Sequence, residues 1–112
     1  MTLRWTDGFA SNATVWPAFT EAMYLLGDLP PAQEALWEML TRAAIQILSL
    51  TTNDVPRMRE LMRRYADRPM DLADAALVAV AERENIRRIF TVDEADFRIY
   101  RIHGRQRFTI IP

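Results

Sequence analysis

Cysteine is absent from this chain of 112 residues, and so is lysine, because all fourteen basic side chains are arginine. Without cysteine the chain forms no disulfide, offers no thiolate to a metal and has no cysteine nucleophile, which fits a reducing, cytoplasmic location. Only three glycines and six prolines are present, so collagen-like repeats and low-complexity tails are excluded. Long uncharged apolar runs and an apolar signal core at the start are also missing, so we expect no membrane span and no secretion signal.

Half of the residues are hydrophobic and 26% are charged, which predicts a folded chain with a single core. The net charge of -1 hides an asymmetry between the two halves. Residues 1–52 hold two arginines and five acids, whereas residues 53–112 hold twelve arginines and ten acids. An arginine-rich second half fits a phosphate-bearing ligand such as a nucleic acid. The alternative explanation is structural: Arg57, Arg64 and Arg68 form the solvent-exposed face of a helix.

The hydrophobic spacing and the positions of proline predict an alternation of helices and strands. We expect helices over 17–26, 31–44, 54–66 and 71–83. Strands are expected over 45–50, 88–92 and 108–111, with a short strand or entry segment over 13–16 and a turn or short strand over 97–102. This order indicates one α/β domain with a mainly parallel sheet.

Several carboxylates occur near the expected carboxyl ends of the strands, where α/β sheets bind ligands. Asp71 and Asp74 begin the helix over 71–83, and Asp93 and Asp96 follow the strand over 88–92. Glu21 lies inside the first helix and faces the same side if that helix packs on the sheet. Separated carboxylates that converge in a partly dry cleft repel one another unless a divalent cation lies between them. Oxygen ligands of this kind favour Mg²⁺ or Mn²⁺ over Zn²⁺.

Each of these residues also has a structural explanation. Asp71 is a natural helix N-cap, Asp74 suits the positive end of a helix, and Asp93 is a common turn residue after a strand. His103, which precedes a glycine, is better explained as a turn residue than as a base. The tryptophans are most simply core or interface anchors, with nucleobase stacking as the minor alternative: Trp5, Trp16 and Trp37.

Three segments resemble the PIN domain, specifically the toxin ribonucleases of VapBC-type toxin–antitoxin modules. They are Thr20–Ala22, Pro69–Leu77 and Ile89–Phe97. The resemblance runs from about Thr14 to Pro112 and leaves residues 1–13 as an atypical N-terminal segment of a single PIN-like domain. It implies a three-layer α/β/α fold, an acidic cluster that binds Mg²⁺ or Mn²⁺ for RNA hydrolysis, and an antitoxin protein as partner.

The resemblance also assigns residues to the site. Glu21 matches the second family acid, Asp74 the third and Asp93 the fourth, so these three are the implied catalytic residues. The implied metal ligands are the same three together with Asp96, the other candidate for the fourth position, while Asp71 is expected to cap its helix. Residues 97–112 contain no acid, and their arginines are expected to contact RNA phosphates: Arg98, Arg101, Arg105 and Arg107.

The start of the chain departs from the family. The family begins with an apolar strand that ends in an aspartate and a helix that follows it, and neither is recognisable here. Asp7 is the one possible substitute, but Gly8–Thr14 is too short for a parallel crossover. Asp7 would therefore have to come from an antiparallel strand or from another subunit.

Two consequences follow for activity and assembly. We expect a weak or inactive nuclease, and the alternative is a degenerate PIN-fold protein that acts as an oligomerising or antitoxin-binding module. Loss of a central strand would leave the strand over 45–50 or the strand over 88–92 with an unpaired edge. Association would cover such an edge, so a homodimer or higher homo-oligomer is expected.

Overall fold

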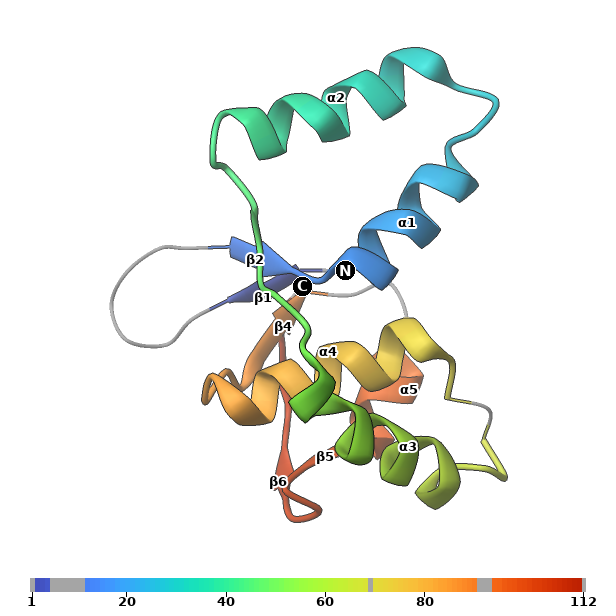
Figure 1. Cartoon of the computed structure of the whole chain (residues 1–112), viewed down its shortest axis with the longest axis vertical. Helices are drawn as coiled ribbons and strands as arrows, with labels where there is room; N and C mark the ends of the chain where they lie inside the picture. The colour runs from blue at the N-terminus through green and yellow to red at the C-terminus, as the bar shows by residue number, and fades with distance from the viewer. Residues whose placement is uncertain (1, 5–11, 69, 91–93, 112) are drawn as a thin grey trace.

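The computed structural model describes residues 2–4, 12–68, 70–90 and 94–111. The helices are α1 (Trp16–Leu25), α2 (Pro30–Thr41), α3 (Val55–Arg64), α4 (Leu72–Arg83) and α5 (Glu94–Ile99), with a 3₁₀ turn η1 (Thr52–Asp54) before α3. The strands are β1 (Thr2–Arg4), β2 (Asn12–Thr14), β3 (Gln46–Ile47), β4 (Arg88–Phe90), β5 (Arg101–Ile102), β6 (Gln106–Arg107) and β7 (Thr109–Ile111). The α/β class predicted from the sequence is confirmed (Figure 1). Within the described ranges, every helix is too short or too polar to cross a membrane.

Five strands form one sheet in the order β3-β2-β1-β4-β7. The pairs β2–β3 and β4–β7 are parallel, and β1 is antiparallel to both of its neighbours. Four of the five strands therefore run in one direction. The two remaining strands, β5 and β6, form a separate antiparallel hairpin.

The N-terminal segment forms the central strand of this sheet. In β1, Thr2 pairs with Phe90 and Arg4 pairs with Arg88. The expectation of an unpaired edge is therefore wrong for the strand over 88–90, because β1 covers one side of β4 and β7 covers the other. Since β1 runs opposite to β4, its C-terminal end lies beside the start of β4. Asp7 itself falls outside the described residues.

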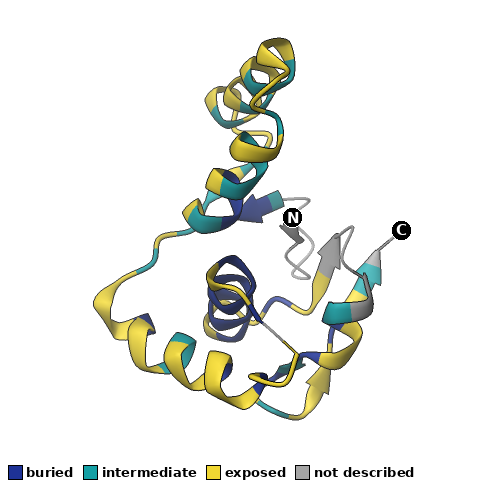
Figure 2. Cartoon of the chain, turned by 90° about the vertical axis from the view of Figure 1, so that its right-hand side faces the viewer, coloured by how far each residue is buried: buried dark blue, intermediate teal, exposed yellow. Residues whose placement is uncertain are grey.

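Helix α4 is the centre of the core. Every residue from Ala73 to Glu82 is buried, and α1 and α3 both pack along this helix. Figure 2 shows α4 enclosed by its neighbours. A helix that is apolar on all sides is stable only when it is surrounded, so the position of α4 determines where the other helices lie.

Helix α2, by contrast, contributes no buried residue. Together with the end of α1 it projects away from the rest of the molecule (Figures 1 and 2). Prolines in the first turns of α1 and α2 fit the fixed φ of that position. Among the exposed apolar side chains of this projection are Leu25, Leu29, Trp37 and Met39.

Three sequence predictions need correction. The helix predicted over 31–44 ends at Thr41, and Ala43 adopts a positive φ of 58° that stops it. The strand predicted over 45–50 is confined to Gln46–Ile47. The turn or short strand predicted over 97–102 is instead the helix α5 followed by β5, because Phe97 and Tyr100, three residues apart, both point into the core.

A partly buried ion pair connects α3 to the end of α4, and the β5–β6 hairpin contacts the same carboxylate. The Arg57 guanidinium donates to both carboxylate oxygens of Glu82 at 2.7 and 2.8 Å, and the His103 backbone N–H donates to Oε2. Burial alone would raise the pKa of Glu82, but the Arg57 and His103 contacts outweigh it and lower that pKa below its usual value. The carboxylate therefore stays ionised in a largely dry position.

We predict that Glu82→Gln lowers the free energy of unfolding by about 2–3 kcal/mol, because it removes the buried carboxylate to which Arg57 donates twice and leaves Arg57 only its pair with the exposed Glu60. Because the pKa of Glu82 is lower in the folded state, its carboxylate stabilises the fold at pH values above its pKa in the unfolded chain, about 4.3. This contribution is lost as the pH falls through the folded-state pKa. Urea unfolding at pH 7 and at pH 3 should therefore show a smaller acid loss in Glu82→Gln than in the wild type. The control is Glu38→Gln, which breaks the exposed pair with Arg42 and should cost below about 0.5 kcal/mol. Equal effects of the two variants would contradict a role for burial.

Candidate functional site

A shallow hollow of about 600 Å³ lies between α1 and the start of α4. Two of its lining residues are acids, Glu21 from α1 and Asp71 from the N-cap of α4. The others are Trp16, Pro17, Thr20, Tyr24, Leu72 and Ala73. Helix α1 follows β2 directly, so its first turns lie near the carboxyl end of that strand. Ligands of α/β sheets bind at such ends.

Asp74 lies in the first turn of α4, directly after Ala73, which lines this hollow. Its residue is only 5% exposed, and the Tyr100 hydroxyl donates to Oδ2 at 3.2 Å. The backbone N–H of Asp74 donates to Oδ1 of Asp71 at 2.8 Å, so Asp71 is the N-cap that the sequence predicted. The N-cap of α4 is therefore Asp71, and the Asp74 carboxylate accepts a hydrogen bond from the buried Tyr100.

The buried Tyr100 hydroxyl lies within the electrostatic influence of three acids. Burial raises the pKa of this hydroxyl, and the charges of Asp74, Asp96 and Asp71 raise that pKa further. Three carboxylates from α4 and α5 thus act on one buried hydroxyl. Asp96 also forms an ion pair with Arg68 at 2.7 Å, so its charge is already balanced in part by the protein.

The described carboxylates agree in chemistry with a hard divalent cation, because all their ligating atoms are oxygen. Among the residues that the structure describes, no three acidic or histidine side chains gather closely enough to hold a metal ion by themselves. Asp93, the predicted fourth acid, falls outside the described residues. The described part of the site therefore supplies Glu21, Asp74 and, beside Arg68, Asp96.

The four predicted RNA-binding arginines separate into different environments. Arg98 and Arg107 line one hollow of about 300 Å³ with Phe108 and Ile110. Arg101 instead donates to the carbonyl oxygens of residues 98, 99 and 100 at 2.6, 2.8 and 3.1 Å, which caps the end of α5. Arg105 is exposed in the turn between β5 and β6.

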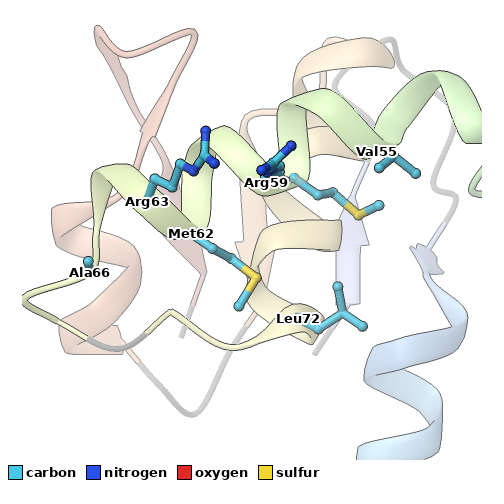
Figure 3. A pocket seen from close by; sticks show the side chains of 7 residues that line it. Val55, Arg59, Met62, Arg63, Ala66 and Leu72 are labelled. Atoms are coloured by element: carbon cyan, nitrogen blue, oxygen red, sulfur yellow. The ribbon is translucent and has the colours of Figure 1, made fainter.

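A third hollow, of about 660 Å³, lies along the outer face of α3 (Figure 3). Its lining is mostly aliphatic and sulfur-containing, with two arginines: Val55, Met58, Arg59, Met62, Arg63, Ala66 and Leu72. It contains no acid, so it offers no ligand for a cation. The hollow between α1 and α4 is the better candidate for phosphodiester chemistry.

Comparison with known proteins places these features in a family. Residues 7–102 match the PIN domain. The chain belongs to the PIN domain family. The PIN-like α/β fold expected from the sequence is thereby confirmed, with the matched region covering β2 to β5.

One relative is the protein named Ribonuclease VapC26 of Mycobacterium tuberculosis, which is 31% identical over 81 residues. The alignment covers 72% of this chain and 60% of the relative. The chain thus resembles a VapC-type PIN protein over most of its own length but spans under two thirds of the relative.

Two residues of the site were not anticipated from the sequence. Tyr100 holds Asp74, and Arg68 pairs with Asp96. Tyr100 is four residues after Asp96, a spacing that places two residues on one face of a helix. This spacing could have indicated Tyr100 only if the segment had been predicted as a helix. The ion pair between Arg68 and Asp96 joins positions 28 residues apart, and no local pattern indicates it.

We predict that Asp71→Ala and Asp74→Asn have different effects on folding. Loss of the N-cap in Asp71→Ala should lower the free energy of unfolding by about 1 kcal/mol, whereas Asp71→Asn keeps a capping oxygen and should cost only a few tenths. Asp74→Asn keeps the size of the side chain and an acceptor for Tyr100, so the fold should persist. Thermal unfolding followed by circular dichroism measures all three variants. Similar losses in Asp71→Ala and Asp71→Asn would contradict the capping role.

Proposed function

We propose that this protein is a divalent-metal-dependent endoribonuclease of the PIN toxin type, in which Glu21, Asp74 and Asp93 form the acidic centre. Asp96 is the further candidate ligand, and Mg²⁺ or Mn²⁺ is the cofactor. The packing of α1 on α4 is the observation that supports this most, because it brings Glu21 to the same hollow as Asp71, Leu72 and Ala73, the residues that directly precede Asp74. Membership of the PIN family supports the same reaction class.

The side chains have separate roles in this proposal. Asp74 lies at the positive end of α4, and its hydrogen bond from Tyr100 fixes the direction of the carboxylate. Glu21 approaches from the opposite wall of the hollow. A cation held between them would supply Lewis-acid chemistry, lowering the pKa of a bound water and neutralising charge on the scissile phosphate. Fixed carboxylates keep the reacting groups in position, which is a large part of the rate enhancement.

The RNA strand is proposed to pass from this centre toward α5 and β6. Arg98 and Arg107 line one hollow and would contact phosphates. Arg105, which is exposed in the β5–β6 turn, would be a further phosphate contact. Arg101 is removed from this set as a primary contact, because its guanidinium caps α5. By family, an antitoxin protein is the proposed partner that restrains the activity.

We predict that Mg²⁺ or Mn²⁺ raises the Tm of the wild type through binding to the folded state. A free cation concentration about a hundredfold above Kd corresponds to about 2.7 kcal/mol of added stability. Asp74→Asn should remove most of this shift. Glu34→Gln is the matched control, because Glu34 is an exposed acid on α2 and should leave the shift unchanged. Differential scanning calorimetry with and without cation measures the effect, and an equal shift in Asp74→Asn would exclude Asp74 as a ligand.

Cleavage is predicted to follow the same residues. The wild type should cleave single-stranded RNA slowly in Mn²⁺ and not in excess chelator, and Glu21→Gln or Asp74→Asn should each lower the rate about a hundredfold. Gel analysis of end-labelled RNA, with Glu34→Gln as control, measures this. Cleavage that persists in both acid variants would show that another site or a contaminant is responsible.

A second candidate function is supported by the exposed projection of α1 and α2. A degenerate PIN-fold protein would use this apolar surface to oligomerise or to bind an antitoxin. No described residue of α2 is buried, so the helix has little reason to stay fixed in isolation. Absence of both the metal shift and the cleavage would favour this function over the nuclease.

We predict a homodimer or higher homo-oligomer that depends on this projection. Replacing Trp37 and Met39 by serine should shift the molar mass from sedimentation equilibrium toward that of one chain, because the change removes apolar surface from the contact. A wild type that remains a single chain at micromolar concentration, with a cooperative melt, would contradict the prediction.

A further inference from the structure

One face of α1 carries aromatic side chains beside the candidate acids. Trp16, Thr20, Glu21 and Tyr24 follow helical spacing and all line the hollow between α1 and α4. Trp16 is 51% exposed and Tyr24 is 83% exposed. Large aromatic surfaces left in water at the edge of a site indicate a binding role more often than a packing role.

The Trp16 ring is held in place before any ligand arrives. Its centroid lies 5.6 Å from that of Phe19, with the two rings nearly perpendicular at 88°. Phe19 is itself buried and also contacts Trp37, with ring centroids 5.2 Å apart. A ring fixed by such contacts loses little conformational entropy when a planar ligand stacks on it.

The spacing of the two rings suits unpaired bases. Trp16 and Tyr24 are eight residues apart, which is about 12 Å along a helix axis, and Glu21 lies between them. Neighbouring bases in a duplex strand are about 3.4 Å apart with their faces covered by stacking. Only an extended, unpaired strand can offer two base faces to rings that far apart. The hollow, at about 600 Å³, has the size of a small-ligand site.

We infer that Trp16 and Tyr24 are stacking platforms for unpaired nucleobases on either side of the bond to be cut, with Glu21 facing the phosphate between them. This inference rests on the proposed nuclease function. Stacking supplies attraction that does not depend on backbone charge, which is needed because the carboxylates of the hollow repel phosphates. Stacking does not distinguish strongly between bases, since every base has a π-face.

The experiment uses Trp16 as its own reporter. In a Trp5→Phe, Trp37→Phe background, Trp16 is the remaining tryptophan. Its fluorescence is followed in a rapid-mixing instrument against a single-stranded RNA dodecamer and the matching duplex, with Mg²⁺ present and the RNA checked for cleavage afterwards. Saturable quenching by the single strand is expected, with duplex binding at least about tenfold weaker.

Variants then separate stacking from general stability. Trp16→Leu and Tyr24→Leu, in the otherwise wild-type chain, should each weaken binding of labelled single-stranded RNA about 5- to 100-fold by fluorescence anisotropy. Trp16→Phe and Tyr24→Phe keep an aromatic face and should retain most of the affinity. Val55→Ala is the control, because Val55 is an exposed apolar residue on α3 and does not line this hollow. It should bind RNA as the wild type does.

Three results would overturn the inference. These are unchanged RNA affinity in both leucine variants, equal binding of duplex and single strand, or a loss of self-association in Trp16→Leu without a loss of RNA binding. The last result would assign the face to a protein partner.

Failure of the nuclease proposal gives a different pattern. Single-stranded RNA would still quench Trp16, but neither cleavage nor a cation-dependent rise in Tm would be seen. Cleavage that depends on Asp74, with KM unaffected by Trp16→Leu and Tyr24→Leu, would retain the nuclease and reject the platforms.

Discussion

The burial of α4 is the constraint on which the structure depends. A helix of alanine, valine and leucine can be enclosed on all sides, but this one also carries Asp74 in its first turn and Glu82 near its end. Each buried carboxylate needs a partner, because an uncompensated charge in a dry interior is costly. Glu82 receives Arg57 and the backbone of His103, which secures α3 and the β5–β6 hairpin. Asp74 receives the Tyr100 hydroxyl, which places α5 beside the candidate site.

The two ends of α4 therefore have different consequences. At Glu82 a cation of the protein balances the charge, and the result is structural. At Asp74 the Tyr100 hydroxyl donates to the carboxylate, and the charges of Asp74, Asp96 and Asp71 all act on that hydroxyl. Negative charge that acts on one buried group is unfavourable for stability alone, which supports the proposed cation site. The geometry and the PIN family membership support the same account.

Much of this was predictable from local pattern, and some was not. The buried character of α4 and the capping by Asp71 follow from short-range sequence, since apolar composition and an aspartate before a helix act locally. An antiparallel N-terminal strand was one of the two possibilities that the sequence left open. The pairing of β1 with β4, more than 80 residues along the chain, could not be predicted, because no local pattern encodes it. Helix α5 has only six residues, too few for a periodic signal, so Tyr100 was missed with it. The exposure of α2 could not be predicted from the sequence either. An apolar stripe on a helix predicts a buried face but does not indicate which element packs against it.

The central claim is that Glu21 and Asp74 share a divalent cation. Anomalous X-ray scattering from crystals soaked in Mn²⁺ tests it most directly, because the ion is located by its own signal. We expect a peak within ligand distance, about 2.0–2.6 Å, of carboxylate oxygens from both residues. A crystal in which Mn²⁺ is bound at exposed acids elsewhere, with no peak between Glu21 and Asp74, would contradict it.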